Sequence, residues 1–455
     1  MNIVKLPLEG VRILDSTYVV AMPYGGGVMT DLGAEVIKIE GPSHVDISRR
    51  LTAPQGADGD VSGDFWNKAP GFNNMNRGKR SLTLDMSRQE GRELFIELIK
   101  VSDIIMENFT PRVMKKWNLT YEDIKKIKPD IIMISNTGYG HSEGPYASYP
   151  GQATTMEATH GTASVTGYLN DIPSKAGMSF VDFLASWSGL FSVASALRYR
   201  NRTGKGQWID IGMYQLGCYF LGEYILDWTD NKRLPSRIGN RHPQYAPQGC
   251  YPTSGNDDEW IVVSALTQDK WNSLCKAMDQ QDLITDVRFI DNASRMAHHD
   301  ELDEIISLFT KKYERFQLME KLQGFDIPSG PVFDSRDYFT NSHNHQRGFI
   351  EKVTADPERN LGTRAFIARP WHLNKTEVKI KGFAPSFGEA NQYVLNELMG
   401  IDNTFIQELI QQDVVNNIPT AYRKNTIDYS AASIPTTGGI KYIDHDYQKN
   451  LGIEI

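Results

Sequence analysis

The feature that most constrains the fold of this sequence is a strand–helix–strand pattern in residues 11–40. Residues 11–15 (VRILD) are an apolar run, Pro23 opens a helical stretch that lasts through Leu32, and residues 34–40 (AEVIKIE) are a second strand-like run. Two strands joined in this way run parallel, because a parallel pair needs a long crossover connection. The chain is therefore predicted to be an α/β protein with a parallel sheet covered by helices.

Three consecutive glycines, Gly25, Gly26 and Gly27, lie in the connection between these strands. A dinucleotide-binding fingerprint would need another glycine where Thr30 stands. It would also place its ribose-binding acid about 20 residues on, later than Glu40. The sheet is therefore Rossmann-like without the nicotinamide signature, and a nicotinamide enzyme is the weakest interpretation. We expect the glycines to allow close helix–strand packing.

Size and composition indicate a globular protein of more than one domain. The 455 residues exceed the size at which a single core stops growing, so two domains are expected. Contents of 40% hydrophobic and 23% charged residues are typical of soluble proteins, and a net charge of −8 argues against nucleic acid as the main partner. No run is predicted to span a membrane, and the start MNIVKLPLEG is not a signal peptide. A cytoplasmic enzyme or binding protein is expected.

The chain has three cysteines, Cys218, Cys250 and Cys275. They are odd in number and far apart, so they show neither a disulfide framework nor metal-ligand spacing. No metal site is predicted.

Residues 46–76 have the composition of a long loop, which in a compact domain is usually functional or faces a partner. The loop ends in a basic cluster at residues 76–80 (NRGKR) before a strand at residues 81–84. Such a cluster is either a solvated charge run or a site for anions such as phosphates.

A helix is expected at residues 88–101 and a strand at residues 103–107, followed by the turn Asn108-Phe109-Thr110-Pro111-Arg112. Ligands bind beyond the carboxyl ends of parallel strands, so this turn is predicted to face a cleft. Phe109 could be plain core, whereas Asn108, Arg112, Lys115 and Lys116 could serve an anionic ligand. The next strand is expected at residues 130–135, with an exit loop that ends at His141.

Asp182 is a lone carboxylate in an apolar setting, between Ser179-Phe180-Val181 and Phe183-Leu184-Ala185. A helix of small and apolar residues is expected at residues 186–199, and Gly204 and Gly206 end it. Asp182 has two interpretations. It is either the N-cap of this helix or a buried carboxylate whose ionisation the surroundings control for chemistry.

Residues 231–248 are polar and rich in turn formers, and they are interpreted as the crossing into a second domain. Beyond them, strands are expected at residues 250–251, 260–264, 348–354 and 378–381, and helices at residues 270–278, 300–323 and 388–399. The last forty or so residues show little periodicity and are interpreted as a wrapping tail.

Seven segments of the chain resemble the family III CoA-transferases, the group of the formyl-CoA, carnitine and benzylsuccinate CoA-transferases. The resemblance covers residues 6–412 and is specific in the order of its parts. They are PLEGVRILDSTYVVAMPYGGGVMTDLGAEVIKIEGP, NRGKRSLTLDM, MENFTPRVMKKWNL, GYGHSEGP, the Asp182 stretch ending in RNRTGKGQWIDIGM, GNRHPQYAPQGCYP and PSFGEANQYVLNELMG.

The resemblance implies a fold in which the N- and C-terminal parts make one Rossmann-like domain and the middle makes a smaller α+β domain. The implied boundaries are 1–228 for the N-terminal part of the large domain, 229–345 for the small domain with its linkers, and 346–455 for the returning part and tail. Two chains would interlock like links, as a homodimer or as a heterodimer with a related subunit.

The resemblance also implies a function, the transfer of coenzyme A from an acyl-CoA, possibly succinyl-CoA, to a carboxylic acid. Asp182 falls at the position of the family's catalytic aspartate, which attacks a thioester and forms an anhydride and then an enzyme-bound CoA thioester. No ATP, metal or tightly bound cofactor is implied. Gly239 or Gly249 could supply a glycine-bearing segment that approaches the site.

Several positions match the family's CoA-binding residues: Tyr18, Val19, Ala21, Leu84, Asn108, Phe109 and, in place of an arginine, Lys116. Val20 replaces a glutamine of the oxalate branch, and Gly41 replaces a basic residue. Both departures favour an acceptor larger or more apolar than oxalate, and residues 151–166 resemble the aryl-succinate branch.

Two rivals remain. An α-methylacyl-CoA racemase would pair Asp182 with a histidine at position 152, but Gln152 stands there and an amide cannot take up a proton near neutral pH. His141 and His160 are interpreted as ordinary surface or core histidines. The second rival is a subunit of a hetero-oligomeric transferase, and the retained Asp182 argues against an inert one.

Overall fold

The computed structural model describes residues 5–50, 56, 63–141, 144–177, 180–255, 258–420, 444 and 446–453. The chain divides into two compact units. The first comprises Met1–His160, Gly177–Gly222 and Phe339–Ile455, and the second comprises Gly161–Ala176 and Glu223–Tyr338. This division differs from the expected boundaries mainly because residues 161–176 group with the second unit.

The first unit is built on a six-stranded parallel sheet with the order β3-β2-β1-β4-β5-β6. The α/β class and the parallel sheet predicted from the opening pattern are therefore confirmed. The strands are β1 (Arg12–Asp15), β2 (Glu35–Glu40), β3 (Arg80–Thr83), β4 (Ile104–Glu107), β5 (Ile132–Thr137) and β6 (Trp208–Gly212). The last of these was not expected from the sequence.

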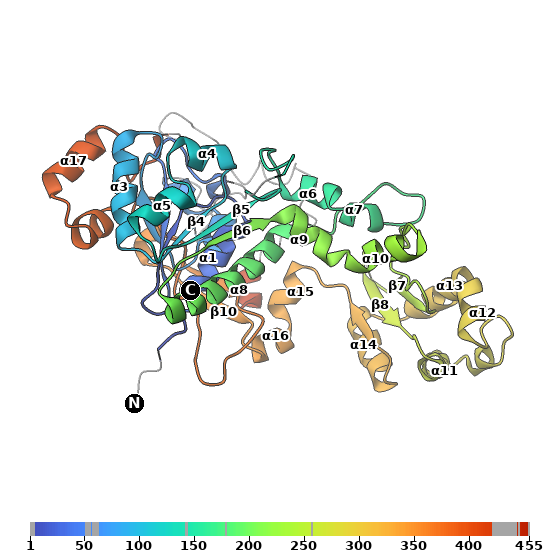
Figure 1. The fold of residues 1–455 in the computed structure, drawn as a ribbon. Helices are drawn as coiled ribbons and strands as arrows, with labels where there is room; N and C mark the ends of the chain where they lie inside the picture. Colours follow the sequence, from blue (N-terminus) through green and yellow to red (C-terminus); the bar gives the residue numbers. More distant parts are fainter. Residues whose placement is uncertain are drawn as a thin grey trace. The chain divides into compact units, whose positions relative to one another are not determined.

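Helices cover both faces of the sheet, and each face has its own apolar cluster. On one face α1 (Ala21–Asp31) and α8 (Phe180–Thr203) pack against β1, β2, β4 and β5. On the other face α3 (Gln89–Lys100) and α5 (Tyr121–Ile127) pack together with α17 (Asn403–Gln411), which lies beside α3 (Figure 1). Burial on both faces explains why these strands read as continuous apolar runs.

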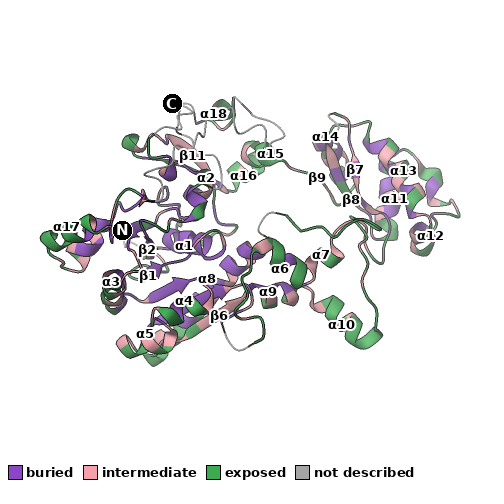
Figure 2. Ribbon diagram, turned by 90° about the horizontal axis from the view of Figure 1, so that it is seen from above, coloured by how far each residue is buried: buried purple, intermediate pink, exposed green. Residues whose placement is uncertain are grey.

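Helix α8 is longer than predicted. It covers the 24 residues Phe180–Thr203, whereas the sequence predicted a helix at residues 186–199. By length and composition alone it is apolar enough to cross a membrane, contrary to the sequence expectation. Figure 2 shows buried residues along part of α8. The buried side chains of Val193, Ala196 and Leu197 belong to the core on the sheet. It is therefore a core helix of the first unit.

The glycines of α1 were expected to allow close helix–strand packing, but in the structure they mainly allow α1 to lie close to α8 and α2. A Cβ atom on Gly25 would stand 3.4 Å from the carbonyl oxygen of Ser186, and one on Gly27 would stand 3.0 Å from the carbonyl oxygen of Met75. Gly26 faces Lys79 and Asp15 at similar distances. Any side chain at these positions would push the helix away from its neighbours.

Two residues of the basic cluster at residues 76–80, Arg77 and Lys79, are buried in ion pairs, whereas Arg80 is exposed. Arg77 is fully buried and forms an ion pair with Asp31 at 3.0 Å, and Lys79 forms one with Asp15 at 2.5 Å. The interpretation as a solvated charge run is wrong for Arg77 and Lys79, because their acidic partners, which lie more than forty residues earlier in the chain, already occupy these cations. Burial lowers the pKa of Lys79 to about 8, and the carboxylate of Asp15 opposes that shift.

Short helices complete the N-terminal part of the first unit. The α-helices are α2 (Pro70–Met75), α4 (Pro111–Lys116), α6 (Ala153–Thr159) and α9 (Met213–Phe220), and the 3₁₀ turns are η1 (Ile47–Arg49) and η2 (Phe65–Asn67). Much of the loop expected at residues 46–76 therefore has regular structure, while its residues 51–55 and 57–62 lie outside the described part.

The C-terminal part adds an antiparallel pair, β10 (Ile350–Thr354) and β11 (Thr363–Ile367). The expected strand at residues 378–381 is wrong, because the partner of β10 comes earlier, at β11. The expected helix at residues 388–399 is a π-helix, η5 (Tyr393–Leu398). Further elements are α16 (Ser342–Gln346), η4 (Pro357–Arg359) and α18 (Tyr447–Asn450). Residues 421–443 of the expected wrapping tail lie outside the described residues.

The second unit has a three-stranded antiparallel sheet of β7 (Gln248–Pro252), β8 (Trp260–Ser264) and β9 (Ser329–Pro331). Its core surrounds the buried side chains of Trp271 and Phe289. The single helix expected at residues 300–323 is two helices, because Glu314 caps a new one and accepts bonds from the amides of Phe316 and Gln317. The helices are α7 (Thr162–Val165), α10 (Gly222–Asn231), α11 (Gln268–Ala277), η3 (Gln281–Ile284), α12 (Asn292–Ala297), α13 (His299–Thr310), α14 (Arg315–Gly324) and α15 (Ser335–Thr340). α10 and α15 each cross the boundary between the units.

Replacing Asp31 by Asn should destabilise the first unit strongly. The fully buried carboxylate of Asp31 pairs with both Arg77 and Arg369 at 3.0 Å, so its loss leaves two buried cations without it. We expect the free energy of unfolding to fall by about 3–5 kcal/mol in denaturant titrations. The matched control is Glu97→Ala, which removes an exposed pair with Lys100 and should cost no more than about 1 kcal/mol. Similar small losses in both variants would contradict this prediction.

Candidate active site

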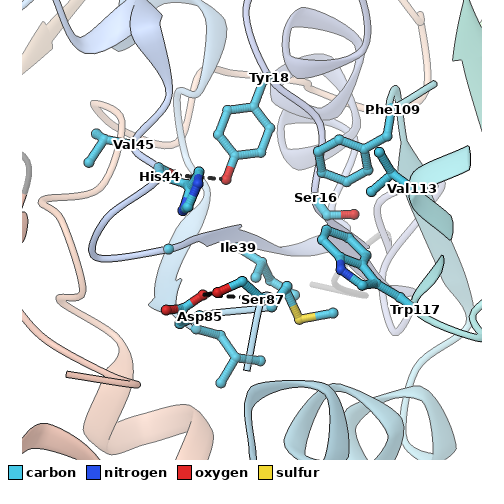
Figure 3. A pocket seen from close by; sticks show the side chains of 13 residues that line it. Ser16, Tyr18, Ile39, His44, Val45, Asp85, Ser87, Phe109, Val113 and Trp117 are labelled. Carbon is cyan, nitrogen blue, oxygen red and sulfur yellow. Dashed lines mark hydrogen bonds between the residues drawn. The ribbon is translucent and has the colours of Figure 1, made fainter. Parts of the chain in front are cut away.

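A pocket of about 340 Å³ lies beyond the carboxyl ends of β1, β2, β3 and β4. It contains the point at which the strand order reverses between β1 and β4, where open α/β sheets bind their ligands. Its lining residues are Ser16, Tyr18, Ile39, Gly41, His44, Val45, Leu84, Asp85, Met86, Ser87, Phe109, Val113 and Trp117 (Figure 3). All of them belong to the first unit.

Three aromatic rings make one side of this pocket. The ring centroids of Tyr18 and Phe109 are 5.8 Å apart, and those of Phe109 and Trp117 are 5.4 Å apart (Figure 3). Trp117 reaches the pocket together with Val113, because residues four apart lie on the same face of a helix. Flat apolar rings opposite Ile39 and Leu84 suit a flat ligand group such as a heterocyclic base.

Cationic side chains lie on the neighbouring face of α4. Arg112 and Lys116 are exposed and four residues apart, and each directly precedes a pocket residue, Val113 or Trp117. They could hold anionic groups of a ligand whose flat end occupies the pocket. Gly41 lines the pocket. It is the position at which the sequence resemblance would place a basic side chain.

Asn108 holds the loop that follows β1. Its side-chain oxygen accepts a hydrogen bond from the amide of Tyr18 at 2.9 Å, and its side-chain nitrogen donates to the carbonyl of Tyr18 at 2.8 Å. Asn108 therefore supports the pocket without lining it. The loops after β1 and β4, ninety residues apart in sequence, are joined by this pair of bonds.

The same loop carries a strained residue, Val19, with φ at 73°. A β-branched residue in the left-handed region is a genuine outlier, and such strain persists where the surroundings enforce it. The carboxylate of Asp46 enforces it here, because it accepts the amide of Val19 at 3.1 Å. Asp46 is itself fully buried and paired with Lys38 at 2.8 Å. Although burial alone would raise the pKa of Asp46, Lys38 and Ser48 hold it below its usual value.

Asp182 lies in the first turn of α8 and is 9% exposed. It is the third residue of the described helix, so it is not the N-cap. The hydroxyl of Ser186, one turn later, bonds to the carbonyls of both Asp182 and Ala21. This contact brings the catalytic candidate next to Val20 and Ala21 at the end of the strained loop. The packing of α1 on α8 thus joins the two candidate groups of residues.

The side chains beside Asp182 in sequence are set in an apolar cluster. Val181 and Ala185 are buried with Ala21, Met156 and Met213. Gln152 is the N-cap of α6, one turn before Met156, and its backbone N–H donates to the hydroxyl of Thr155 at 3.0 Å. The side chain of Gln152 is an amide, at the position where a racemase would need a histidine.

The two histidines that were weighed for this role are both largely buried. His141 bonds through Nε2 to the carbonyl of Phe109 at 3.1 Å, and His160 packs against Gly217. Burial lowers the pKa of both rings below the usual histidine value. They fit the interpretation of core histidines, although His141 is bonded to a pocket residue.

The sequence missed several lining residues of the pocket, notably Trp117, His44 and Val113. Helical spacing could have identified Trp117 and Val113, because Lys116 and Arg112 were already candidates on the same short helix. Gly239 and Gly249 both lie in the second unit, the first in a turn with φ at 62° and the second in β7. Among the described residues no cluster could hold a metal ion, and the three cysteines are free.

Comparison with known proteins identifies relatives along most of the chain. The sequence profile of CoA-transferase family III matches residues 8–391. The beta subunit of succinyl-CoA–L-malate CoA-transferase of Chloroflexus aurantiacus is 30% identical over 413 residues, which are 90% of this chain and 98% of the relative. The succinate–glutarate CoA-transferase of Agrobacterium fabrum is 30% identical over 88% of this chain and 98% of its own length.

Two further comparisons extend this finding. The acetyl-CoA:oxalate CoA-transferase of Acetobacter aceti is 33% identical over 72% of this chain and 82% of the relative. A solved structure, a CAIB/BAIF family protein from Brucella suis, superposes with a TM-score of 0.77 at 29% identity and covers 87% of this chain and 100% of that one. The sequence resemblance therefore extends to the three-dimensional fold.

Replacing Asn108 by Ala should weaken the binding of coenzyme A. The change removes both bonds to the Tyr18 backbone and releases a loop that carries one wall of the pocket. We expect the Kd of coenzyme A, measured by titration calorimetry, to rise about tenfold, because two partly buried hydrogen bonds are lost. Asn403→Ala, at the start of α17, is the control and should leave the Kd unchanged. An unaltered Kd in Asn108→Ala would show that the pocket does not depend on the two hydrogen bonds between Asn108 and the backbone of Tyr18.

Proposed function

This chain belongs to CoA-transferase family III, and we propose that it moves coenzyme A from succinyl-CoA to a carboxylic acid through covalent intermediates on Asp182. The observation that carries the proposal is the bonding of the Ser186 hydroxyl to the backbone carbonyls of Asp182 and Ala21, which joins the first turn of α8 to the end of the loop whose Tyr18 lines the pocket. In this proposal the pocket binds the nucleotide end of the acyl-CoA. The thioester end lies toward Asp182.

The first half of the reaction charges the enzyme. A carboxylate oxygen of Asp182 attacks the thioester carbon, so a C–O bond forms, the C–S bond breaks and the CoA thiolate leaves. The thiolate then attacks the Asp182 carbonyl of the mixed anhydride and expels succinate. The result is an aspartyl-CoA thioester, and no ATP is consumed because a thioester and a carboxylate are exchanged for another such pair.

The second half repeats these steps in reverse. The acceptor carboxylate attacks the aspartyl thioester and expels the CoA thiolate, and the thiolate attacks the acceptor carbonyl of the new anhydride. The products are the new acyl-CoA and free Asp182. Each step passes through an oxyanion, and Asp182 lies in the first turn of α8, at the end of the helix dipole that favours negative charge.

The acceptor is proposed to be larger or more apolar than oxalate. Val20 is half-buried and packs with the apolar cluster beneath α1, so it offers no hydrogen bond to a small diacid. Relatives named for malate and glutarate support a longer dicarboxylic acid, whereas the relative named for oxalate is the counterexample that the assay has to include.

The chain is also proposed to form an interlocked dimer. Large apolar side chains are exposed along α8, α9 and α10, among them Phe191 at 74%, Tyr219 at 81% and Leu226 at 62%. None of the residues of α10 is buried within the chain. Exposed apolar side chains of this kind on each unit are typical of a subunit interface. A related second subunit is the alternative partner, since one relative is named as the beta subunit of a transferase.

Asp182 should be trapped as a covalent adduct. After incubation with succinyl-CoA, hydroxylamine should convert Asp182 to a hydroxamate that peptide mass spectrometry detects. Asp182→Ala should lose the adduct and at least about 1,000-fold in kcat, because the nucleophile is gone. Glu97→Ala should retain both. The absence of an adduct, together with solvent deuterium entering the α-carbon of a branched acyl-CoA, would favour the racemase.

Replacing Leu226 by Asp should shift the protein from dimer to monomer in sedimentation velocity. A carboxylate in an apolar interface loses its hydration without a partner, which disfavours association. Val287→Asp is the control, because Val287 is also exposed, at 80%, but lies outside these helices. A monomeric wild type that dimerises only with a related chain would point to the hetero-oligomer instead.

A further inference from the structure

The backbone of Phe109, the central ring of the pocket's aromatic side, is held by two side chains. The carboxylate of Glu107 accepts the Phe109 amide at 2.9 Å, and Nε2 of His141 donates to the Phe109 carbonyl at 3.1 Å. The same Nε2 stands 3.2 Å from the other carboxylate oxygen of Glu107. The backbone N–H and the backbone carbonyl of Phe109 are therefore both held by the pair formed by Glu107 and His141.

The pair is built into the sheet. Glu107 on β4, Ser135 on β5 and Asp210 on β6 stand in register across three adjacent parallel strands, so their side chains share a face. Ser135 donates to Glu107 and accepts from the indole of Trp208 at 3.0 Å. Asp210 accepts the amide of His141 at 2.8 Å.

Aromatic packing closes this arrangement around the imidazole. The ring of His141 packs edge-on against Trp208, with centroids 6.0 Å apart. Trp208 in turn stacks on Tyr121 of α5, with centroids 6.4 Å apart. The imidazole thus has little freedom to leave the Phe109 carbonyl.

The charge of Glu107 is unusual for a residue with a supporting role. Its side chain is fully buried, and among the described residues no lysine or arginine forms an ion pair with it. Burial, with a further contribution from Asp210, raises the pKa of Glu107 to about 7, and burial lowers the pKa of His141. The titratable groups around the pair are Asp210 of β6 and, through Trp208, Tyr121 of α5.

We propose that Glu107 and His141 are positioning residues that hold Phe109 in place in the pocket. Protonation of this pair weakens the binding of the nucleotide end of coenzyme A in the pocket. The inference rests on the proposed function, which assigns this pocket to the acyl-CoA. Neither residue is proposed to touch the reacting atoms.

The effect of the proton follows from the contacts. Ionised Glu107 accepts the Phe109 amide and the Ser135 hydroxyl, while its buried oxygen Oε1 lies 3.2 Å from Nε2 of His141 and has no hydrogen-bond partner among the described residues. A proton on the oxygen that faces His141 needs an acceptor, and Nε2 can accept it only by moving its own proton to Nδ1. The bond from His141 to the Phe109 carbonyl is then lost, and the wall loosens.

The test compares coenzyme A binding by calorimetry in wild type, Glu107→Gln, His141→Ala and His141→Gln between pH 6 and pH 8. Glutamine at 107 mimics the protonated acid, so we expect a Kd about tenfold higher than wild type at pH 8 and a ratio near one at pH 6. Taking the ratio at each pH cancels the titration of the coenzyme's own phosphate. His141→Ala should weaken binding at both pH values, while His141→Gln keeps an N–H donor and should restore it. His372→Gln, an exposed substitution, is the control.

Stability measurements separate this role from a general loss of structure. Because the folded pKa of Glu107 lies above the unfolded one, ionisation costs folding stability as the pH rises through 7. Glu107→Gln should therefore have a higher Tm than wild type at pH 8, and the difference should shrink as the pH falls and vanish only below the unfolded carboxyl pKa of about 4.3. Weaker binding by a more stable protein cannot come from unfolding.

The outcomes are distinct. Wild-type Kd values in Glu107→Gln and His141→Ala at pH 8 would overturn the inference, and so would a loss that His141→Gln does not restore. A wild-type protein that does not bind coenzyme A at all would instead overturn the proposed function. For kinetics, the inference expects KM for the acyl-CoA to rise with kcat little changed, unlike the effect of Asp182→Ala.

Discussion

The site depends on a set of ion pairs buried beneath the carboxyl edge of the sheet. Lys38 pairs with Asp46, Lys79 with Asp15 and Arg49 with Glu40, all with side chains shielded from solvent. Asp46 uses its second oxygen to hold the strained amide of Val19. Buried pairs of this kind add little net stability over apolar residues, but losing one partner is costly, so they fix one arrangement.

Close helix packing connects this charged layer to the candidate nucleophile. Gly25 allows the backbone of α1 to approach Ser186, and the hydroxyl of Ser186 bonds to the carbonyls of Ala21 and Asp182. The loop with Tyr18 and Val19 is therefore fixed at one end by Asp46 and Asn108 and at the other by α8. A carboxylate that must attack a bound thioester benefits from such fixed geometry, because orientation contributes much of the rate.

The main outline of the fold was readable from local patterns, and particular errors show where such patterns end. The first strand–helix–strand unit, the strands at β4 and β5, and Asp182 followed from apolar runs and ordered motifs. β6 was missed because Gly206 looked only like the end of a helix. In the structure a Cβ atom on Gly206 would lie 1.9 Å from the carbonyl oxygen of Ile131, so glycine is needed for the chain to come alongside β5. The burial of Arg77 and Lys79 was not predicted for a similar reason, since their partners Asp31 and Asp15 are distant in sequence.

The sequence by itself determined the parallel α/β sheet, the family and the identity of most candidate residues, because periodicity and ordered motifs are local and survive without coordinates. Only the tertiary structure decided what these residues do for one another. Asn108 supports Tyr18 instead of lining the pocket, Trp117 completes the aromatic side, and His141 joins Glu107 behind Phe109. Such contacts join residues from different strands and loops, and their energies depend on distance and burial, which no spacing along the chain encodes.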